Sequence, residues 1–400
     1  MNRLDFKGKN LNTSKLTSED VQKYIWYINV ATFLFFLVLN AQASILAPYA
    51  MNVLEVQPFT AGVLASLLFI VAILFRPFFG FMYDRGYKFE ALILGCLTSL
   101  AASIAYYFPD IRILVLGRIM QGLGVGLFLP ASVSIVLDMA PEGQVGETLG
   151  WRSAMHGISQ VVGPSVGTYL ADFLGFQTTF GVTIFICIAP IIMLYAVKRK
   201  VTLRKTVPKK GESKLAYVKN ADFILATLTT ALYTVSYSGI STFLPAYYKT
   251  VGLGTATYGV YAAIMGASSI AVRIFGGKQA DRKGPRGIAL LGCAIFLAAY
   301  TGLCFYPLPP SAYLMAFIIG IALGFWVPGI QLLGFKDINP EARGFSSSVY
   351  FTCADLGLLL GPIIFGYLID NYGYSIMFPV LPPIFIVNMM IILAGKLLKN

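Results

Sequence analysis

Residues 273–282 read RIFGGKQADR, and residues 76–85, which lie 197 positions earlier, read RPFFGFMYDR. The two stretches share Arg, Gly, Asp and Arg at the same four positions. Other residues repeat in order at an offset of 197 or 198: Ser44 and Ser241, Pro48 and Pro245, Leu94 and Leu291, Gly122 and Gly320, Gly126 and Gly324, Pro130 and Pro328, Gly163 and Gly361, and Asp172 and Asp370. Chance does not place so many pairs in order at one spacing, so the sequence predicts a tandem duplication.

The composition indicates that the duplicated template lies in a membrane. Of the 400 residues, 57% are hydrophobic and 12% are charged, whereas about 25% of a soluble domain is charged. Apolar runs are found at residues 24–49, 57–82, 89–108, 112–137, 147–170, 178–197, 220–245, 256–276, 286–307, 311–333, 344–368 and 374–396. Each run is close to the roughly 20 residues that a membrane-spanning helix needs. We therefore expect an all-α membrane protein with 12 transmembrane helices in two pseudo-symmetric six-helix bundles.

The distribution of basic residues predicts how the chain is oriented. The formal net charge is +12, but Lys and Arg fall between apolar runs and do not form the aromatic-lined patch of a nucleic-acid binder. If the N-terminus is cytoplasmic, 24 of the 30 Lys and Arg residues lie in cytoplasmic segments, and the outer loops hold only Arg112 and Lys249. The positive-inside rule then places both termini in the cytoplasm of a multi-pass protein, which we expect in the plasma membrane.

The domain boundaries follow from these runs. Residues 1–23 are polar and lack the apolar core of a signal peptide, so they are expected to form a cytoplasmic tail. Residues 24–197 and 220–400 are expected to form the two bundles, joined by a Lys-rich cytoplasmic linker at 198–219. The five cysteines lie inside apolar runs without metal-ligand spacing. No metal or cofactor is therefore expected, and the protein is expected to be a monomer.

The two matched loops have the chemistry of a gate. A glycine lets neighbouring helices approach closely. An aspartate near a helix end pairs with an arginine across the seam between the halves in one state and releases it in the other. The predicted cytoplasmic gate comprises Arg76, Gly80, Asp84, Arg85, Arg273, Gly277, Asp281 and Arg282. The alternative is a pair of solvated turns whose charges only set the orientation.

The fourth run carries a charge deep inside its span. It reads Arg118-Ile-Met-Gln121-Gly122-Leu-Gly124, and Arg118 lies about 9 Å from the outer end at 1.5 Å per residue. A charge at this depth is costly unless it faces a cavity or a partner. The repeat positions in the second half are Ala316 and Ile319, so the template does not require these polar groups. A functional role is favoured over snorkelling to the interface.

The fifth run combines a polar stripe with a glycine-proline pair. Arg152, His156 and Gln160 are four residues apart and share one helix face. Gly163-Pro164 and its repeat Gly361-Pro362 permit a bend, so we expect helix hinges there. The alternative is a packing kink without a functional role.

These motifs resemble those of the major facilitator superfamily over nearly the whole chain. The loops resemble its G-x-x-x-D-R-x-G signature, and the fourth and fifth runs resemble signatures of its drug:proton antiporter branch. The first loop lacks the residue between Arg85 and Gly86, and Thr168 stands where the fifth-helix signature ends in glycine. The resemblance implies six plus six helices that rock about a central site, and it implies export.

Asp355 is the one carboxylate placed deep inside any apolar run. Desolvation favours its neutral form, so it is the first choice for a proton carrier, with Arg118 and His156 completing a proton-coupling set. A structural hydrogen bond is the alternative role. The predicted substrate cavity comprises Asn40, Gln42, Gln121, Arg152, Gln160, Tyr233 and Tyr237. The deep positive charges of Arg118 and Arg152 outnumber the one deep negative charge of Asp355. This charge balance predicts a neutral, zwitterionic or anionic cargo.

The sequence therefore predicts a secondary active transporter that exports a small organic molecule by proton-coupled alternating access. Its partners are the small-molecule substrate, protons and the lipid bilayer. A proton-coupled symporter or a uniporter that imports a small organic anion is the alternative, and a non-transporting sensor or lipid scramblase ranks lower. An intramembrane enzyme is disfavoured, because His156 and the Gly157-Ile-Ser159 stretch point to different sides of one helix.

Overall fold

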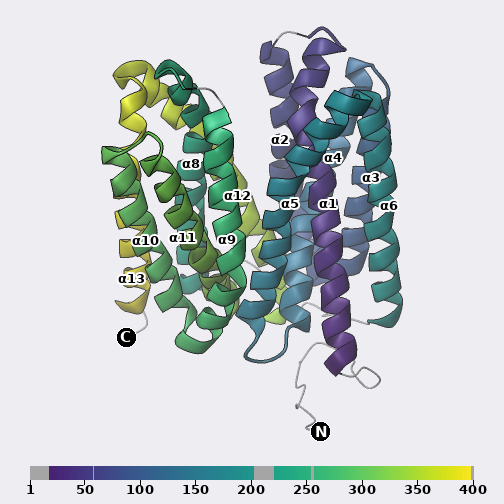
Figure 1. The fold of residues 1–400 in the computed structure, drawn as a ribbon. Coiled ribbons are helices and arrows are strands. Elements are labelled where there is room, and N and C mark those ends of the chain that lie inside the picture. Colours follow the sequence, from purple (N-terminus) through teal and green to yellow (C-terminus); the bar gives the residue numbers. More distant parts are fainter. Residues whose placement is uncertain (1–17, 57, 202–219, 254–255, 398–400) are drawn as a thin grey trace. The chain divides into compact units, whose positions relative to one another are not determined.

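The computed structural model describes residues 18–56, 58–201, 220–253 and 256–397. The predicted linker at 198–219 lies outside the described residues from position 202 onward, and so does the predicted tail up to residue 17. The described residues are mostly α-helical (Figure 1), with short 3₁₀ turns at Pro340–Ala342 and Tyr374–Met377.

Most helices are longer than the apolar runs because they continue at their polar ends, whereas α3, α10 and α13 are no longer than theirs. Their bounds are α1 (Ser18–Asn52), α2 (Pro58–Asp84), α3 (Lys88–Tyr107), α4 (Ile111–Met139), α5 (Val145–Leu174), α6 (Phe176–Lys200), α8 (Ala221–Thr250), α9 (Ala256–Lys283), α10 (Pro285–Phe305), α11 (Ser311–Phe335), α12 (Arg343–Tyr372) and α13 (Leu381–Leu397), with η1 (Pro340–Ala342) and η2 (Tyr374–Met377). Among the described residues, 11 helices are long and apolar enough to cross a membrane. The helix α5 is not one of them, because it carries Arg152, His156 and Gln160 within its middle turns.

The chain packs as two compact units. Unit 1 comprises Met1–Glu142, Met155–Glu212 and Asn339–Thr352, and unit 2 comprises Gly143–Ala154, Ser213–Ile338 and Cys353–Asn400. The predicted bundles at 24–197 and 220–400 follow the sequence order, and the units differ from them at two segments. The first turns of α12 pack in unit 1, and the first turns of α5 pack in unit 2.

The packing inside each unit repeats the same pattern. In unit 1, α2 packs on α4, α3 on α4 and α6, and α1 on α6; in unit 2, α9 packs on α11, α10 on α11 and α13, and α8 on α13 (Figure 1). Each helix of the second set occupies the repeat position of its counterpart in the first. The internal sequence repeat therefore corresponds to a repeat of helix packing.

Two glycines end the matched loops in the same way. Gly86, between α2 and α3, has φ 88°, and Gly284, between α9 and α10, has φ 89°. Glycine adopts this left-handed conformation without the steric penalty of a side chain. The residue missing between Arg85 and Gly86 therefore leaves the left-handed turn in place.

Candidate functional site

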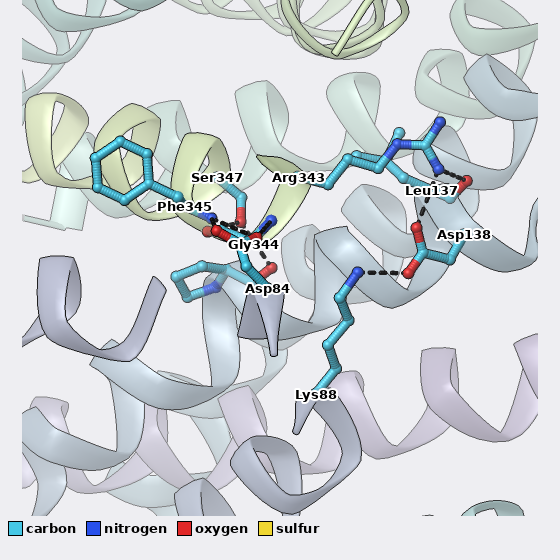
Figure 2. Close-up of polar contacts among 9 residues, drawn as sticks. Asp84, Lys88, Leu137, Asp138, Arg343, Gly344, Phe345 and Ser347 are labelled. Atoms are coloured by element: carbon cyan, nitrogen blue, oxygen red, sulfur yellow. Dashed lines mark hydrogen bonds and ion pairs between the residues drawn. The ribbon is translucent and has the colours of Figure 1, made fainter. Parts of the chain in front are cut away.

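A buried carboxylate lies against the beginning of α12. Asp84, at the end of α2, is fully buried. Its Oδ1 accepts hydrogen bonds from the backbone N–H of Gly344 at 2.9 Å and of Phe345 at 3.1 Å, as Figure 2 shows. Because α12 begins at Arg343, these are first-turn N–H groups without a partner inside the helix. The negative charge also lies at the positive end of the helix dipole.

The repeat position carries the same contact in unit 2. Asp281 Oδ1 accepts from the N–H of Gly146, and Oδ2 accepts from the N–H of Glu147, both at 2.8 Å. The helix α5 begins at Val145, so these N–H groups also belong to a first turn. The sequence predicted an arginine opposite the aspartate; for Asp281 the structure places the start of a helix there.

Glycines make these approaches close. A Cβ on Gly80 would lie 2.9 Å from Ser348 Oγ and 3.0 Å from Phe345 Cα, within unit 1. A Cβ on Gly277 would collide with the carbonyl oxygen of Gly146, within unit 2. A side chain at either position would therefore push the start of α12 or α5 away from its aspartate.

A second group of charges, which the sequence reasoning missed, holds the start of α12. Asp138, at the end of α4, forms ion pairs with Lys88 and with Arg343, and its Oδ1 lies 3.0 Å from Nη1 of Arg343 (Figure 2). The same Nη1 donates to the carbonyl of Leu137 at 2.8 Å. Only 5% of the Asp138 side chain is exposed. Asp138 follows the predicted fourth run by one residue, and an acidic residue there was the signal that could have identified it.

Unit 2 has different chemistry at the corresponding positions. Val145 stands at the repeat position of Arg343, and Lys336 stands at that of Asp138. The nearby carboxylate is Asp222, which pairs with Arg286 and lies 3.9 Å from Lys336. The start of α12 is therefore held by two carboxylates, and that of α5 by Asp281 together with an exposed Lys278–Glu147 pair at 3.0 Å.

The four predicted gate arginines divide by burial. Arg76 is fully buried, and its guanidinium carbon lies 6.0 Å from the ring centroid of Phe351. Arg273 is buried and donates to the carbonyl of Ser153. Arg85 and Arg282 are exposed and form no ion pair among the described residues. Burial therefore separates Arg76 and Arg273, inside their units, from Arg85 and Arg282 at the surface.

Arg118 is the end of a buried hydrogen-bond network in unit 1. Its Nε donates to the carbonyl of Leu64 at 2.9 Å, and its Nη1 donates to Gln121 Oε1 at 2.6 Å. Gln121 Nε2 donates to Gln42 Oε1 at 2.7 Å. The remaining bonds of the network are Arg118 to Ala65, Tyr106 to Gln121, and Gln42 to Ser103 and Thr183. The network links α1, α2, α3, α4 and α6, so the polar groups of Gln42 and Gln121 are engaged within the unit.

The polar stripe of α5 does not have uniform surroundings. Arg152 is buried and belongs to unit 2. His156 belongs to unit 1 and is half-buried, and its ring centroid lies 4.1 Å from that of Phe36. Gln160 is exposed. The side-chain amide of Asn40 donates to the carbonyl of Phe36 at 2.8 Å, one turn earlier on α1.

The predicted residues of unit 2 lie among aromatic rings or in the interior. Asp355 is buried, with 6% exposure, within α12. Tyr233 packs on Trp326 with ring centroids 4.8 Å apart and on Tyr237 at 6.0 Å. Arg118 and His156 belong to unit 1, so the proton-coupling set is divided between the units.

The predicted hinges are close helix contacts in both units. A Cβ on Gly163 would lie 3.1 Å from the carbonyl oxygen of Leu37. A Cβ on Gly361 would collide with the carbonyl oxygen of Val235. The helices α5 and α12 continue through Pro164 and Pro362. These glycines therefore bring α5 onto α1 and α12 onto α8.

Comparison with known proteins gives the family. The model of the Major Facilitator Superfamily matches residues 28–362. The chain therefore belongs to this superfamily of secondary transporters, and it is a multi-pass membrane protein that carries small molecules rather than an enzyme. The described residues contain no cluster of three or more His, Cys, Asp and Glu side chains that could hold a metal ion.

Similar proteins agree with this assignment. The chain is 28% identical over 342 residues to the uncharacterized MFS-type transporter YuxJ of Bacillus subtilis, covering 80% of this chain and 83% of that protein. It is 24% identical over 338 residues to the multidrug resistance protein MdtG of Klebsiella pneumoniae, covering 82% of this chain and 81% of that one.

Solved structures share the fold at low identity. The human organic anion transporter MFSD10 (TETRAN) superposes with a TM-score of 0.79 at 13% identity, over 93% of this chain and 99% of that chain. The E. coli fucose:proton symporter FucP superposes with a TM-score of 0.75 at 14% identity, over 93% and 98%. The predicted all-α membrane fold of this superfamily is confirmed.

Proposed function

We propose that the protein exports a small organic molecule by proton-coupled alternating access. Membership of the superfamily and the similarity to proteins named multidrug resistance protein MdtG support export. The observation that carries the proposal is the matched pair of carboxylates, Asp84 and Asp281, each bonded to the first turn of a long helix. A transporter with two repeated halves needs contacts of this kind that form in one state and break in another.

The gate in this proposal includes the two helix starts that the aspartates hold. Two hydrogen bonds from backbone N–H groups to one carboxylate are strong when the group is buried and charged. They are lost when the start of α12 or α5 moves by a few ångströms. The Asp138–Arg343 ion pair is a second contact that holds the start of α12. Gly80 and Gly277 permit the approach, and Arg76 and Arg273 lie one helical turn before them.

Proton coupling is assigned to Asp355. Placing a carboxylate in the middle of a membrane helix costs about 2.5–3.5 kcal/mol on insertion scales, and protonation removes most of that cost. Arg118 contributes to the set through its positive charge. His156 completes the set as a second titratable group.

The driving force is sufficient for export. A pH gradient of one unit supplies about 1.4 kcal/mol per proton, and a potential of 100 mV adds about 2.3 kcal/mol per charge. Together they support a cargo gradient of several hundredfold for each proton. The Arg118 and Arg152 charges, set against Asp355, favour neutral, zwitterionic or anionic cargo.

Inverted and right-side-out vesicles test the direction. With an imposed pH gradient, fluorescein should accumulate in inverted vesicles and be excluded from right-side-out ones, while ethidium should not be transported. Accumulation in right-side-out vesicles would favour the import of an organic anion. Strong saturable ethidium export would overturn the proposed charge preference. A reconstituted protein that moves no solute but flips lipids would support the scramblase alternative.

We also propose that both termini are cytoplasmic, that the protein lies in the plasma membrane, and that it works as a monomer. The predicted excess of basic residues in the segments that include both termini supports this orientation. Protease digestion of a C-terminal epitope tag in inverted vesicles, but not in right-side-out ones, is the expected result. Protection in inverted vesicles would reverse the orientation.

A further inference from the structure

Unit 2 contains a group of tyrosines from three helices, which we call the tyrosine cluster: Tyr233 and Tyr237 of α8, Tyr258 and Tyr261 of α9, and Tyr300 of α10. The ring centroids of Tyr233 and Tyr237 lie 6.0 Å apart, and those of Tyr258 and Tyr261 lie 6.1 Å apart. Tyr261 and Tyr300 belong to one cluster of buried residues, against which Tyr233 and Tyr258 pack. The rings of Tyr233 and Tyr300 both pack on Phe296, with centroids 5.6 Å and 6.0 Å from it. Phenol groups from α8, α9 and α10 therefore converge.

The hydroxyl groups of the tyrosine cluster have no hydrogen-bond partner among the described residues. Tyr261 is 1% exposed and Tyr300 is 2% exposed. None of the five hydroxyl oxygens is among the buried polar atoms that lack a partner, so each faces space that a hydrogen-bonding ligand or water can occupy. Five phenols that converge without bonding to the protein are consistent with a binding site for hydrogen-bond acceptors.

A buried cation lies beside these phenols. Arg273 is 9% exposed; its Nη1 donates to the carbonyl of Ser153 at 2.5 Å, and its Nε donates to the hydroxyl of Ser269 at 3.1 Å. Both partners are neutral, and Arg273 forms no ion pair among the described residues. Tyr233 and Tyr237 lie within range of its charge, as does the buried Arg152. A buried guanidinium with neutral partners is strongly stabilised by an anion.

The helix packing that the two halves share does not depend on the phenol groups. The repeat positions of Tyr233, Tyr261 and Tyr300 in the first half are Phe36, Leu64 and Ser103. The same packing is therefore built there without a tyrosine at these three positions. Arg273 itself repeats as Arg76, so the phenols distinguish the surroundings of the two arginines.

We propose that Arg273 and the tyrosine cluster bind the carboxylate of a small organic acid. Arg273 supplies the positive charge through its guanidinium fork, and Tyr233 and Tyr237 donate hydrogen bonds to the carboxylate oxygens. The phenol rings provide apolar contact for the organic part of the acid. That this acid is the cargo rests on the proposed transport function; that it binds here does not.

Equilibrium dialysis of the purified full-length protein with benzoate, benzamide and benzylammonium tests this site. The three probes share a ring and differ in charge, and empty micelles correct for partition into detergent. Benzoate should bind saturably at millimolar concentration, and the other two should bind at least about tenfold more weakly. Equal binding of the three probes, tighter binding of benzylammonium, or no saturable benzoate binding would overturn the proposal.

Substitutions locate the bound benzoate. Tyr237→Phe and Tyr233→Phe keep the ring, and each should weaken benzoate binding about tenfold. Arg273→Gln should weaken it further and remove the preference for benzoate over benzamide. The controls are the exposed residues Arg112 and Tyr169, tested as Arg112→Gln and Tyr169→Phe, which should bind benzoate as the parent does. Retention of the parent affinity in Tyr233→Phe, Tyr237→Phe and Arg273→Gln would refute the site.

The proposed carboxylate binding and the proposed export can each be refuted without refuting the other. Dialysis requires neither a gradient nor a conformational cycle. Benzoate that binds but is not moved outward would refute the proposed export and leave the carboxylate site intact. Export of other molecules by a protein to which benzoate does not bind would refute the carboxylate site and leave export intact.

Discussion

The carboxylate of Asp84 accepts a hydrogen bond from the backbone N–H of Gly344 at 2.9 Å, in the first turn of α12. The two residues are 260 positions apart in the chain. Asp281 makes the same type of contact with Gly146 at the start of α5. Duplication has therefore produced two helix starts that are each held by a carboxylate from a matched loop.

Removing the negative charge of Asp84 should loosen the start of α12. Asp84→Asn retains an oxygen acceptor but loses the charge that interacts with the helix dipole, a contribution of about 1–2 kcal/mol in buried geometries. Amide hydrogen exchange at residues 344 and 345 should become roughly 5- to 30-fold faster. Exposed Asp172, tested as Asp172→Asn, is the control. Unchanged exchange in Asp84→Asn would show that the charge does not hold the helix.

The buried Asp138–Arg343 pair should contribute more to the free energy of unfolding than an exposed ion pair does. Arg343→Gln removes one partner of a carboxylate that is 5% exposed and keeps Lys88 as the other, so it should destabilise the protein by about 1.5–3 kcal/mol. The Lys198–Glu90 pair is 3.1 Å long with 38% and 42% exposure, so Glu90→Gln should cost at most about 1 kcal/mol. Chemical denaturation in detergent measures both. Equal losses of unfolding free energy in the two variants would show that the buried pair does not hold the start of α12.

Breaking the network at Gln121 should leave several groups without partners. Gln121→Leu removes the acceptor of Arg118 and Tyr106 and the donor to Gln42. Each unsatisfied buried group costs about 1–3 kcal/mol, so a large drop in thermal stability is expected. The exposed Gln160, tested as Gln160→Leu, should have little effect. If the two variants unfold at the same temperature, the network does not stabilise the fold.

The repeated glycine contacts should tolerate no side chain. Gly361→Ala places a Cβ against Ser238 and the carbonyl of Val235, so the variant should be destabilised by about 1–3 kcal/mol through overpacking. Gly259→Ala, where no atom lies within 4 Å of the added Cβ, should be neutral or stabilising, because alanine favours helices. Thermal unfolding of the two variants compares them directly. A Gly361→Ala variant as stable as Gly259→Ala would contradict the close packing of α12 on α8.

The apolar runs and the sequence repeat were sufficient to predict the fold, and the repeat drew attention to the two aspartates because they recur at a fixed spacing. It could not identify the partners of these aspartates, because a backbone N–H has no side-chain signature. Arg343 was missed for another reason: it pairs with Asp138 across 205 positions and has no repeat counterpart. Gln42 was predicted to line a cavity, yet it bonds to Ser103 and Thr183; polarity inside a membrane helix does not distinguish the two roles.

Proton flux driven by the cargo tests the central claim most directly. In liposomes that contain the purified protein and a pH-sensitive dye, an outward fluorescein gradient without an imposed pH gradient should drive protons in the opposite direction. Asp355→Asn should retain its fold, bind cargo and abolish this flux, because its side chain cannot carry a proton. Cargo-driven proton flux that persists unchanged in Asp355→Asn, or cargo movement without any proton flux in the parent protein, would contradict the account.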